Sequence, residues 1–149
     1  NVTSAADMAD VVKSKAAEQD IIIMTAAVAD FCPSHPADEK IKKNDSSYES
    51  VIELERTEDI LSYLGAHKAK GQLICGFSME TQNMLENSKA KLAKKNADMI
   101  VANNLKEAGA GFGTDTNVVT LITADDCTEL EIMDKSCVAA RIMDRLLQM

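Results

Sequence analysis

Charged side chains that could bind a phosphorylated ligand follow a short apolar segment near the start of the chain. Ile21–Thr25 is a run of aliphatic residues, typical of a strand that is buried on both faces of a parallel sheet. Small residues lead from this run to Asp30, and a loop then carries Lys40, Lys42 and Lys43. Small side chains let a ligand approach the backbone at the carboxyl end of a strand, and lysines supply positive charge to phosphate. The pattern therefore predicts a nucleotide site at the end of this strand.

The composition is that of one globular domain with an aliphatic core. The chain has 149 residues, of which 46% are hydrophobic, 27% charged and only 3% aromatic. This is enough material for a core and too many aliphatic residues for a disordered chain. The net charge of −8 argues against non-specific binding to nucleic acids or acidic membranes, because both need a positive surface.

The thiols and imidazoles do not predict a metal site. No two cysteines form a CxxC pair, and the two histidines are not spaced to complete a zinc site. We interpret the thiols as buried or idle groups in a reducing compartment. No apolar run approaches the length of a membrane span and no signal peptide opens the sequence, so we expect a cytoplasmic protein without a membrane partner. The cysteines are Cys32, Cys75, Cys127 and Cys137, and the histidines are His35 and His67.

Segments with the apolar pattern of a helix alternate along the chain with segments that have the apolar pattern of a strand. We expect helices at about 4–19, 57–67, 81–96 and from 134 onward. We expect strands at 21–25, 72–77, 98–102, 117–123 and 129–132, an exposed or edge strand at 50–54 and a long loop at 31–47. This order predicts an α/β, Rossmann-like three-layer fold, with a mostly parallel sheet and an antiparallel β-hairpin at its edge.

The start of the chain differs from a complete fold of this type. The sequence opens on the first predicted helix, without a preceding strand and the glycine-rich turn that would hold phosphate. We therefore expect residues 1–149 to form a single, partial domain whose N-terminal part is missing.

Motifs spread over the whole chain resemble those of the bacterial phosphopantothenoylcysteine synthetases, the ligase half of the bifunctional coenzyme A biosynthesis flavoprotein. They occur in the family's order and at similar spacing, and Glu58 stands where the family has proline. The motifs are Ala26-Ala27-Val28-Ala29-Asp30-Phe31, Glu39-Lys40-Ile41-Lys42-Lys43, Glu58-Asp59-Ile60-Leu61, Gly76-Phe77-Ser78-Met79-Glu80-Thr81, Lys91-Leu92-Ala93-Lys94-Lys95-Asn96-Ala97-Asp98, Ala102-Asn103 and Asp115-Thr116-Asn117.

The resemblance implies a CTP-dependent ligation in two steps. The carboxylate of phosphopantothenate attacks the α-phosphate of CTP to give an acyl-cytidylate and pyrophosphate, and the amine of cysteine then displaces CMP. Mg²⁺ would accompany the triphosphate. FMN would belong only to the decarboxylase domain that is fused upstream in the family. The resemblance also implies a homodimer, in which the partner chain helps to close the site.

The resemblance also implies roles for particular residues. Lys40 would be the catalytic cation, and no residue would be a dedicated metal ligand. The implied nucleotide-binding residues are Met24, Thr25, Ala26, Asp30, Lys40, Glu58, Asp59, Ile60, Leu61, Phe77, Lys91 and Lys95.

Other interpretations stay open from the sequence alone. The chain could be an ATP-using ligase of the same class, or a non-catalytic α/β module for nucleotide binding or dimerisation. By residue type alone, Lys40 fits a solvated loop, Asp30 a turn or helix cap, and Phe77 the core. Lys91 and Lys95 share one face of a helix and would also complement the negative end of its dipole.

Overall fold

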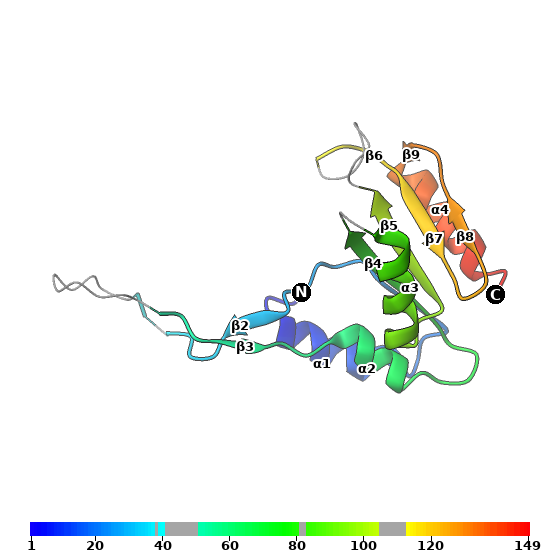
Figure 1. Cartoon of the computed structure of the whole chain (residues 1–149). Helices are drawn as coiled ribbons and strands as arrows, with labels where there is room; N and C mark the ends of the chain where they lie inside the picture. Colours follow the sequence, from blue (N-terminus) through cyan, green and yellow to red (C-terminus); the bar gives the residue numbers. More distant parts are fainter. Residues whose placement is uncertain (38, 41–50, 81–82, 105–112) are drawn as a thin grey trace.

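The computed structural model describes residues 1–37, 39–40, 51–80, 83–104 and 113–149, and its centre is a five-stranded sheet (Figure 1). The strands follow the order β1-β4-β5-β7-β8 across this sheet. They are β1 (Ile21–Met24), β4 (Leu73–Glu80), β5 (Met99–Asn104), β7 (Val119–Ile122) and β8 (Cys127–Glu129).

Most strands of the sheet point in the same direction. β1, β4 and β5 are parallel neighbours, whereas β7 is antiparallel to both β5 and β8. β7 is thus the one strand of the five that opposes the others, and β7 and β8 form a hairpin at the edge. The predicted mostly parallel sheet with an antiparallel hairpin edge is confirmed. Two short strands, β6 (Thr116–Asn117) and β9 (Met133–Asp134), pair beside it.

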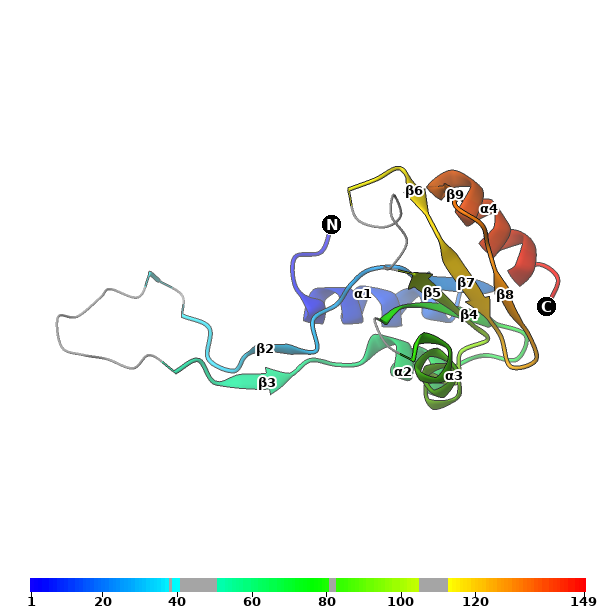
Figure 2. The same ribbon diagram turned by 45° about the horizontal axis from the view of Figure 1, so that its top comes forward.

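Helices cover both faces of the sheet, which gives the predicted three layers (Figure 2). One face carries α1 (Ala5–Ala16), α2 (Ile60–Ala66) and α3 (Met84–Lys95), and the other carries α4 (Lys135–Leu146). Side chains of β1 alternate between the two layers, as they must on a pleated strand. Ile21 and Ile23 pack into the cluster on the α4 side, whereas Ile22 and Met24 pack into the cluster beneath α1 and α2.

β1 is less buried than the sequence predicts. All four of its residues are half-buried, because β1 is an edge strand of the described sheet. The fully buried strands are its inner neighbours, where Ile74, Met99, Ile100 and Val101 have no exposed surface. The expectation of a strand buried on both faces is therefore wrong for β1 in this structure, although its side chains do contact both layers.

The ends of the first two helices depend on short polar side chains. Ser4 caps α1 in a capping box with Asp7. α2 starts at Ile60, later than the predicted residue 57, and its cap is Asp59. Thr57 does not cap the helix because its hydroxyl donates to the Ala29 carbonyl and its N–H donates to the Asp30 carbonyl at 3.0 Å.

Between β1 and α2 the chain leaves the sheet as an arm, which we define as the described residues 31–37, 39–40 and 51–56. Its described part contains the antiparallel pair β2 (Phe31–Pro33) and β3 (Leu54–Arg56), which reaches away from the sheet in Figures 1 and 2. The predicted loop at 31–47 is wrong over residues 31–33, and the predicted strand at 50–54 begins only at Leu54. Residues 41–50, which include Lys42 and Lys43, lie outside the described residues, as does Thr81.

A close contact between α2 and α3 fixes the distance between these two helices. A Cβ atom added at Gly65 would lie 1.8 Å from the Lys95 carbonyl oxygen, so only glycine allows the observed approach. Asn96 ends α3 in a left-handed conformation, with φ of 48°, and its amide donates to the Gly65 carbonyl at 2.7 Å. The backbone at the end of α3 is therefore held directly against α2.

We expect Gly65→Ala to destabilise the protein by about 1–3 kcal/mol, because the added methyl group must push α2 and α3 apart. Urea unfolding followed by circular dichroism would measure this loss. Ala90→Ser, at an exposed position on α3, is the matched control and should change stability by less than about 0.5 kcal/mol. Unchanged stability of Gly65→Ala would mean that the helices can separate at no cost.

Candidate functional site

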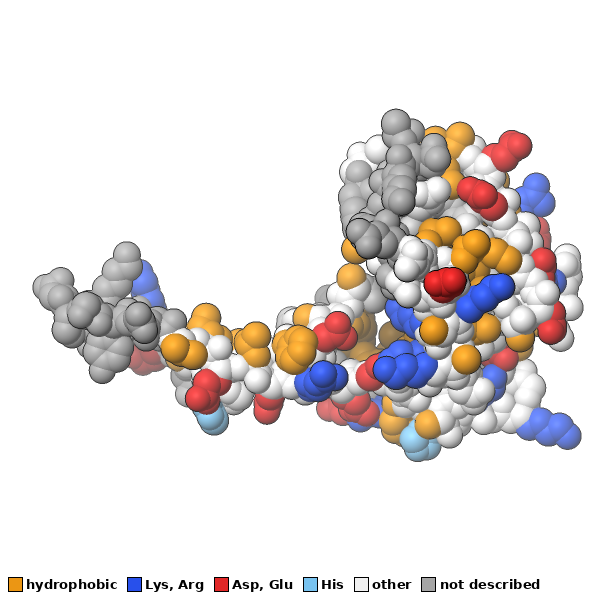
Figure 3. All heavy atoms as spheres, viewed as in Figure 1, with side chains coloured by type: hydrophobic (Ala, Val, Ile, Leu, Met, Phe, Trp, Pro, Cys, Tyr) orange, Lys and Arg blue, Asp and Glu red, His pale blue; other side chains and the backbone are white. Residues whose placement is uncertain are grey.

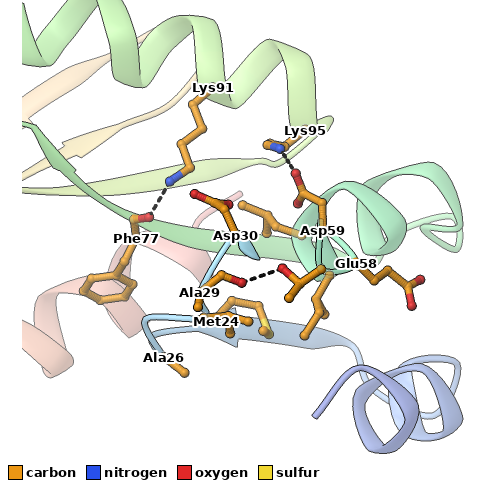
Figure 4. A pocket seen from close by; sticks show the side chains of 13 residues that line it. Met24, Ala26, Ala29, Asp30, Glu58, Asp59, Phe77, Lys91 and Lys95 are labelled. Carbon is orange, nitrogen blue, oxygen red and sulfur yellow. Dashed lines mark hydrogen bonds and ion pairs between the residues drawn. The ribbon is translucent and has the colours of Figure 1, made fainter. Parts of the chain in front are cut away.

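A cavity of about 170 Å³ opens where β1 and β4 end, next to α2 and α3 (Figure 4). Its place at the carboxyl ends of two parallel strands is the usual one for ligands in open α/β sheets. The lining residues are Met24, Ala26, Val28, Ala29, Asp30, Thr57, Glu58, Asp59, Ile60, Leu61, Phe77, Lys91 and Lys95. The volume is below the roughly 300–1,000 Å³ of typical small-molecule sites.

Small residues bring the backbone to the surface of this cavity. Ala26 and Ala29 follow β1 and leave the main chain accessible on that side. On the β4 side, a Cβ added at Gly76 would lie 2.6 Å from Leu61 Cδ2. The glycine therefore allows Leu61 of α2 to pack directly on the strand and form a wall of the cavity.

Asp30 is held in place by its backbone and leaves its carboxylate exposed. The backbone carbonyls of Ala29 and Asp30 accept hydrogen bonds from the hydroxyl and the N–H of Thr57, respectively. These two bonds join the segment that enters the arm to the segment that leaves it. In Figure 4 the Asp30 carboxylate points to the side of the cavity where Lys91 and Lys95 lie. An ionised carboxylate only accepts hydrogen bonds. Asp30 can thus bind a donor group of a ligand, such as a hydroxyl or an amine.

Two lysines of α3 form the cationic side of the cavity. They are four residues apart and so lie on one face of the helix. Lys91 Nζ donates to the carbonyl oxygen of Phe77 at 3.0 Å, whereas Lys95 Nζ contacts the carboxylate of Asp59 and the Ser62 hydroxyl. The positive charges therefore sit at fixed points, close to the end of β4 and the start of α2.

Asp59 has two neighbours that favour its charged form. Burial alone would raise the pKa of its carboxyl group, but the hydrogen bonds from Lys95 and Ser62 outweigh burial and hold the pKa below its ordinary value. One carboxylate oxygen accepts the Ser62 N–H at 3.0 Å as the cap of α2, and the other pairs with Lys95. Asp59 therefore joins the start of α2 to the cationic side of the cavity.

Glu58 and Phe77 contribute less of their side chains than the sequence suggests. The Glu58 carboxylate turns away from the cavity in Figure 4 and pairs with Lys13 of α1 at 2.7 Å. The Phe77 ring packs against the core cluster on the α4 side, while its carbonyl oxygen holds Lys91. The backbone of both residues remains at the cavity.

The structure brings together all the predicted nucleotide-binding residues except Thr25 and Lys40. Thr25 follows β1 and is exposed. Val28, Ala29 and Thr57 also line the cavity, although they are not among the predicted residues. Val28 and Ala29 lie inside the AAVADF motif, so their inclusion was predictable. No pattern in the sequence indicated that the Thr57 hydroxyl donates a hydrogen bond to the Ala29 carbonyl.

Lys40 does not lie at the cavity of its own chain. It is an exposed residue of the arm, beyond β2, and the arm reaches away from the sheet (Figure 1). The predicted placement of Lys40 beside Asp30, at the end of β1, is therefore not what the structure shows. The physical reason is the pairing of β2 with β3, which extends this part of the chain outward.

The described part of the chain contains neither a cluster of potential metal ligands nor a helix that could span a membrane. Among those residues, no group of three or more His, Cys, Asp or Glu side chains is arranged to hold a metal ion. No helix within the same ranges has the length and apolar character needed to cross a membrane.

Comparisons with known proteins identify relatives of the chain. The family described as "DNA/pantothenate metabolism flavoprotein C-terminal domain" matches residues 1–149. The "Coenzyme A biosynthesis bifunctional protein CoaBC" of Bacillus subtilis (strain 168) is 48% identical over 146 residues, which cover 97% of this chain and 35% of that protein. A "Cysteine/Cysteine sulfinic acid decarboxylase" from an unknown prokaryotic organism is 45% identical over 148 residues, which cover 99% of this chain and 41% of that protein.

A solved structure has the same fold. The crystal structure of the C-terminal domain of a coenzyme A biosynthesis bifunctional protein CoaBC superimposes with a TM-score of 0.77 at 41% identity, over 99% of this chain and 65% of that one. The chain thus spans less than half the length of the two relatives named above, and about two thirds of this crystallised domain.

We expect the Asp59–Lys95 ion pair to make the stability of the folded protein depend on pH in the acidic range. Because the pKa of Asp59 is lower in the folded protein than its ordinary 3.8, the pair stabilises the fold above that pH, and the stabilisation is lost as the pH falls through the lower value. Thermal unfolding should give a higher Tm for the wild type than for Asp59→Asn at neutral pH, and this difference should shrink as the pH falls below 3.8 and the Asp59 carboxylate becomes protonated. A difference that persists in acid would show that the charge of Asp59 is not its source.

Proposed function

Because the chain belongs to the family of DNA/pantothenate metabolism flavoprotein C-terminal domains, we propose that it joins phosphopantothenate to cysteine with CTP, in the cytoplasm, as a step of coenzyme A biosynthesis. The observation that carries this proposal is the cavity, which gathers small residues, Asp30 and two lysines at the ends of β1 and β4. The name of the Bacillus subtilis relative, a bifunctional coenzyme A biosynthesis protein, supports the same activity.

The proposed reaction has two steps. A carboxylate oxygen of phosphopantothenate attacks the α-phosphorus of CTP, the bond to the β-phosphate breaks, and pyrophosphate leaves with its electron pair. The amine of cysteine then attacks the acyl carbon, CMP leaves, and the amine proton passes to solvent. Both steps bring anions together, so the protein must neutralise negative charge and hold the reactants in line.

The residues of the cavity suit these requirements. Lys91 and Lys95 supply positive charge, and the accessible backbone after β1 and at the start of α2 can hydrogen-bond to a base. Asp30 would repel phosphate and is suited to donor groups, namely the ribose hydroxyls or the amino group of cytosine. Mg²⁺ would be carried by the triphosphate, since this ion usually binds phosphates with few protein ligands.

We propose that Lys40 acts at the cavity of a second copy of the chain. The apolar side chains along the arm are exposed, with Phe31 at 50%, Leu54 at 59% and Ile52 at 72% (Figure 3). A two-stranded hairpin is at best marginally stable alone in water, so contact with a second copy would stabilise the arm. A homodimer joined through the arms would bring Lys40 to the partner's cavity, where its charge can meet the α-phosphate.

The activity can be tested with the full-length protein. We expect release of pyrophosphate when CTP, Mg²⁺, phosphopantothenate and cysteine are all present, and a much lower rate with ATP. Formation of CMP together with the amide would identify the reaction. A faster reaction with ATP would favour the ATP-using class. Binding of CTP without any turnover would indicate a non-catalytic nucleotide-binding module. Decarboxylation of cysteine sulfinic acid without nucleotide would contradict the proposal.

Mixed dimers test the proposed place of Lys40. Lys40→Gln keeps an intact cavity but lacks the lysine, and Asp30→Asn keeps the lysine but has a damaged cavity, so each variant alone should be nearly inactive. Randomly mixed subunits should recover about a quarter of wild-type turnover, because half of the dimers then contain one complete site. No recovery in dimers shown to be mixed would mean that Lys40 serves its own chain.

A further inference from the structure

The two lysines of the cavity are held by different kinds of acceptor. Lys91 donates to a neutral carbonyl oxygen, that of Phe77. Lys95 is paired with a carboxylate, that of Asp59, and its Nζ also lies 3.0 Å from the Ser62 hydroxyl. A ligand phosphate can therefore join Lys91 without displacing an anion, but at Lys95 it meets a negative charge that already occupies the ammonium.

Asp59 is more easily displaced from the ion pair than Lys95 is. Its side chain is 50% exposed, whereas that of Lys95 is only 13% exposed. Lys95 also sits at the end of α3 that is fixed against Gly65, so its backbone has little freedom to move. If the pair opens, the carboxylate can turn toward water while the ammonium stays at the cavity.

The second oxygen of Asp59 has a separate task. Oδ1 accepts the Ser62 N–H at 3.0 Å and caps α2, whereas Oδ2 pairs with Lys95. Asparagine and serine also cap helices well. Either residue at position 59 can therefore keep the hydrogen bond from the Ser62 N–H while removing the negative charge that pairs with Lys95. The two tasks can thus be separated by substitution.

We propose that Asp59 is an internal competitor for phosphate: it holds the Lys95 ammonium in the free protein and releases it when a nucleotide phosphate takes its place. The inference rests on the proposed function, since it needs a phosphorylated nucleotide in this cavity. A carboxylate and a phosphate offer the same charged oxygen acceptors to one ammonium, and holding both there is opposed by their mutual repulsion. Asp59 thereby lowers the affinity for nucleotide and keeps Lys95 ordered until the ligand arrives.

The competition makes a prediction opposite to that for an ordinary binding residue. Removing the carboxylate should strengthen binding, and the gain should require Lys95. We expect Asp59→Asn to bind CTP about fivefold more tightly, the change that a partly exposed ion pair can account for. Cytidine, which has no phosphate, should bind both proteins equally.

A double-mutant cycle in the full-length protein tests this by calorimetry with CTP and Mg²⁺. The four proteins are wild type, Asp59→Asn, Lys95→Met and the double variant, with Asp59→Ser as a second form that keeps the cap. Asp126→Asn, which removes the partner of Arg145 far along the chain, is the matched control and should leave the affinity unchanged. Circular dichroism would confirm that each variant is folded.

Each outcome of the cycle decides between the alternatives. Tighter binding by Asp59→Asn that disappears in the Lys95→Met background supports competition. An equal gain in both backgrounds would show general repulsion instead, and weaker binding would show that Asp59 itself contacts the nucleotide; either result overturns the inference alone. If the wild-type protein binds no CTP at all, the proposed function fails and the inference with it.

Discussion

The contact between α2 and α3 determines where the charged groups of the cavity lie. At Gly65 the two helices approach so closely that a single methyl group would meet the carbonyl oxygen of Lys95. Toward the start of α2, its cap residue Asp59 and Ser62 bind the Lys95 ammonium. Backbone packing and side-chain charge thus meet at the same residue of α3. The cationic side of the cavity is consequently as rigid as this helix pair. A substitution at Gly65 should therefore shift Lys95 and change ligand binding.

The chain divides its chemistry between a fixed part and an outlying part. The cavity is built at the edge of the sheet, from the segment after β1, the start of α2 and the inner face of α3. The arm leaves the sheet between the first two of these, and its base is closed by the hydrogen bonds of Thr57 with Ala29 and Asp30. The position of Asp30 and the direction of the arm are therefore set by the same two contacts.

The sequence predicted the layers and most of the site, and it did less well where distant segments decide the structure. Apolar and helical periodicity located β1, β4, β5, β7 and all four helices, because their apolar faces are local patterns. The AAVADF motif and the lysines of α3 led to the cavity for the same reason. The edge strand β8 (Cys127–Glu129) lies mostly before the predicted strand at 129–132. Three features could not be read in this way. Thr57 binds back to Ala29, β2 pairs with β3 across a gap of some twenty residues, and the resulting arm removes Lys40 from its own cavity. Each depends on pairing between segments that no local pattern links.

The proposed chemistry requires a nucleotide to lie between the end of β1 and the start of α2. A crystal structure of the full-length protein with CTP and Mg²⁺ would test this directly. We predict electron density for the nucleotide along Ala26 and Ala29, with its phosphates near Lys95 and with Asp59 turned toward solvent. Density for CTP at any other place in the fold, with this cavity empty, would contradict the account.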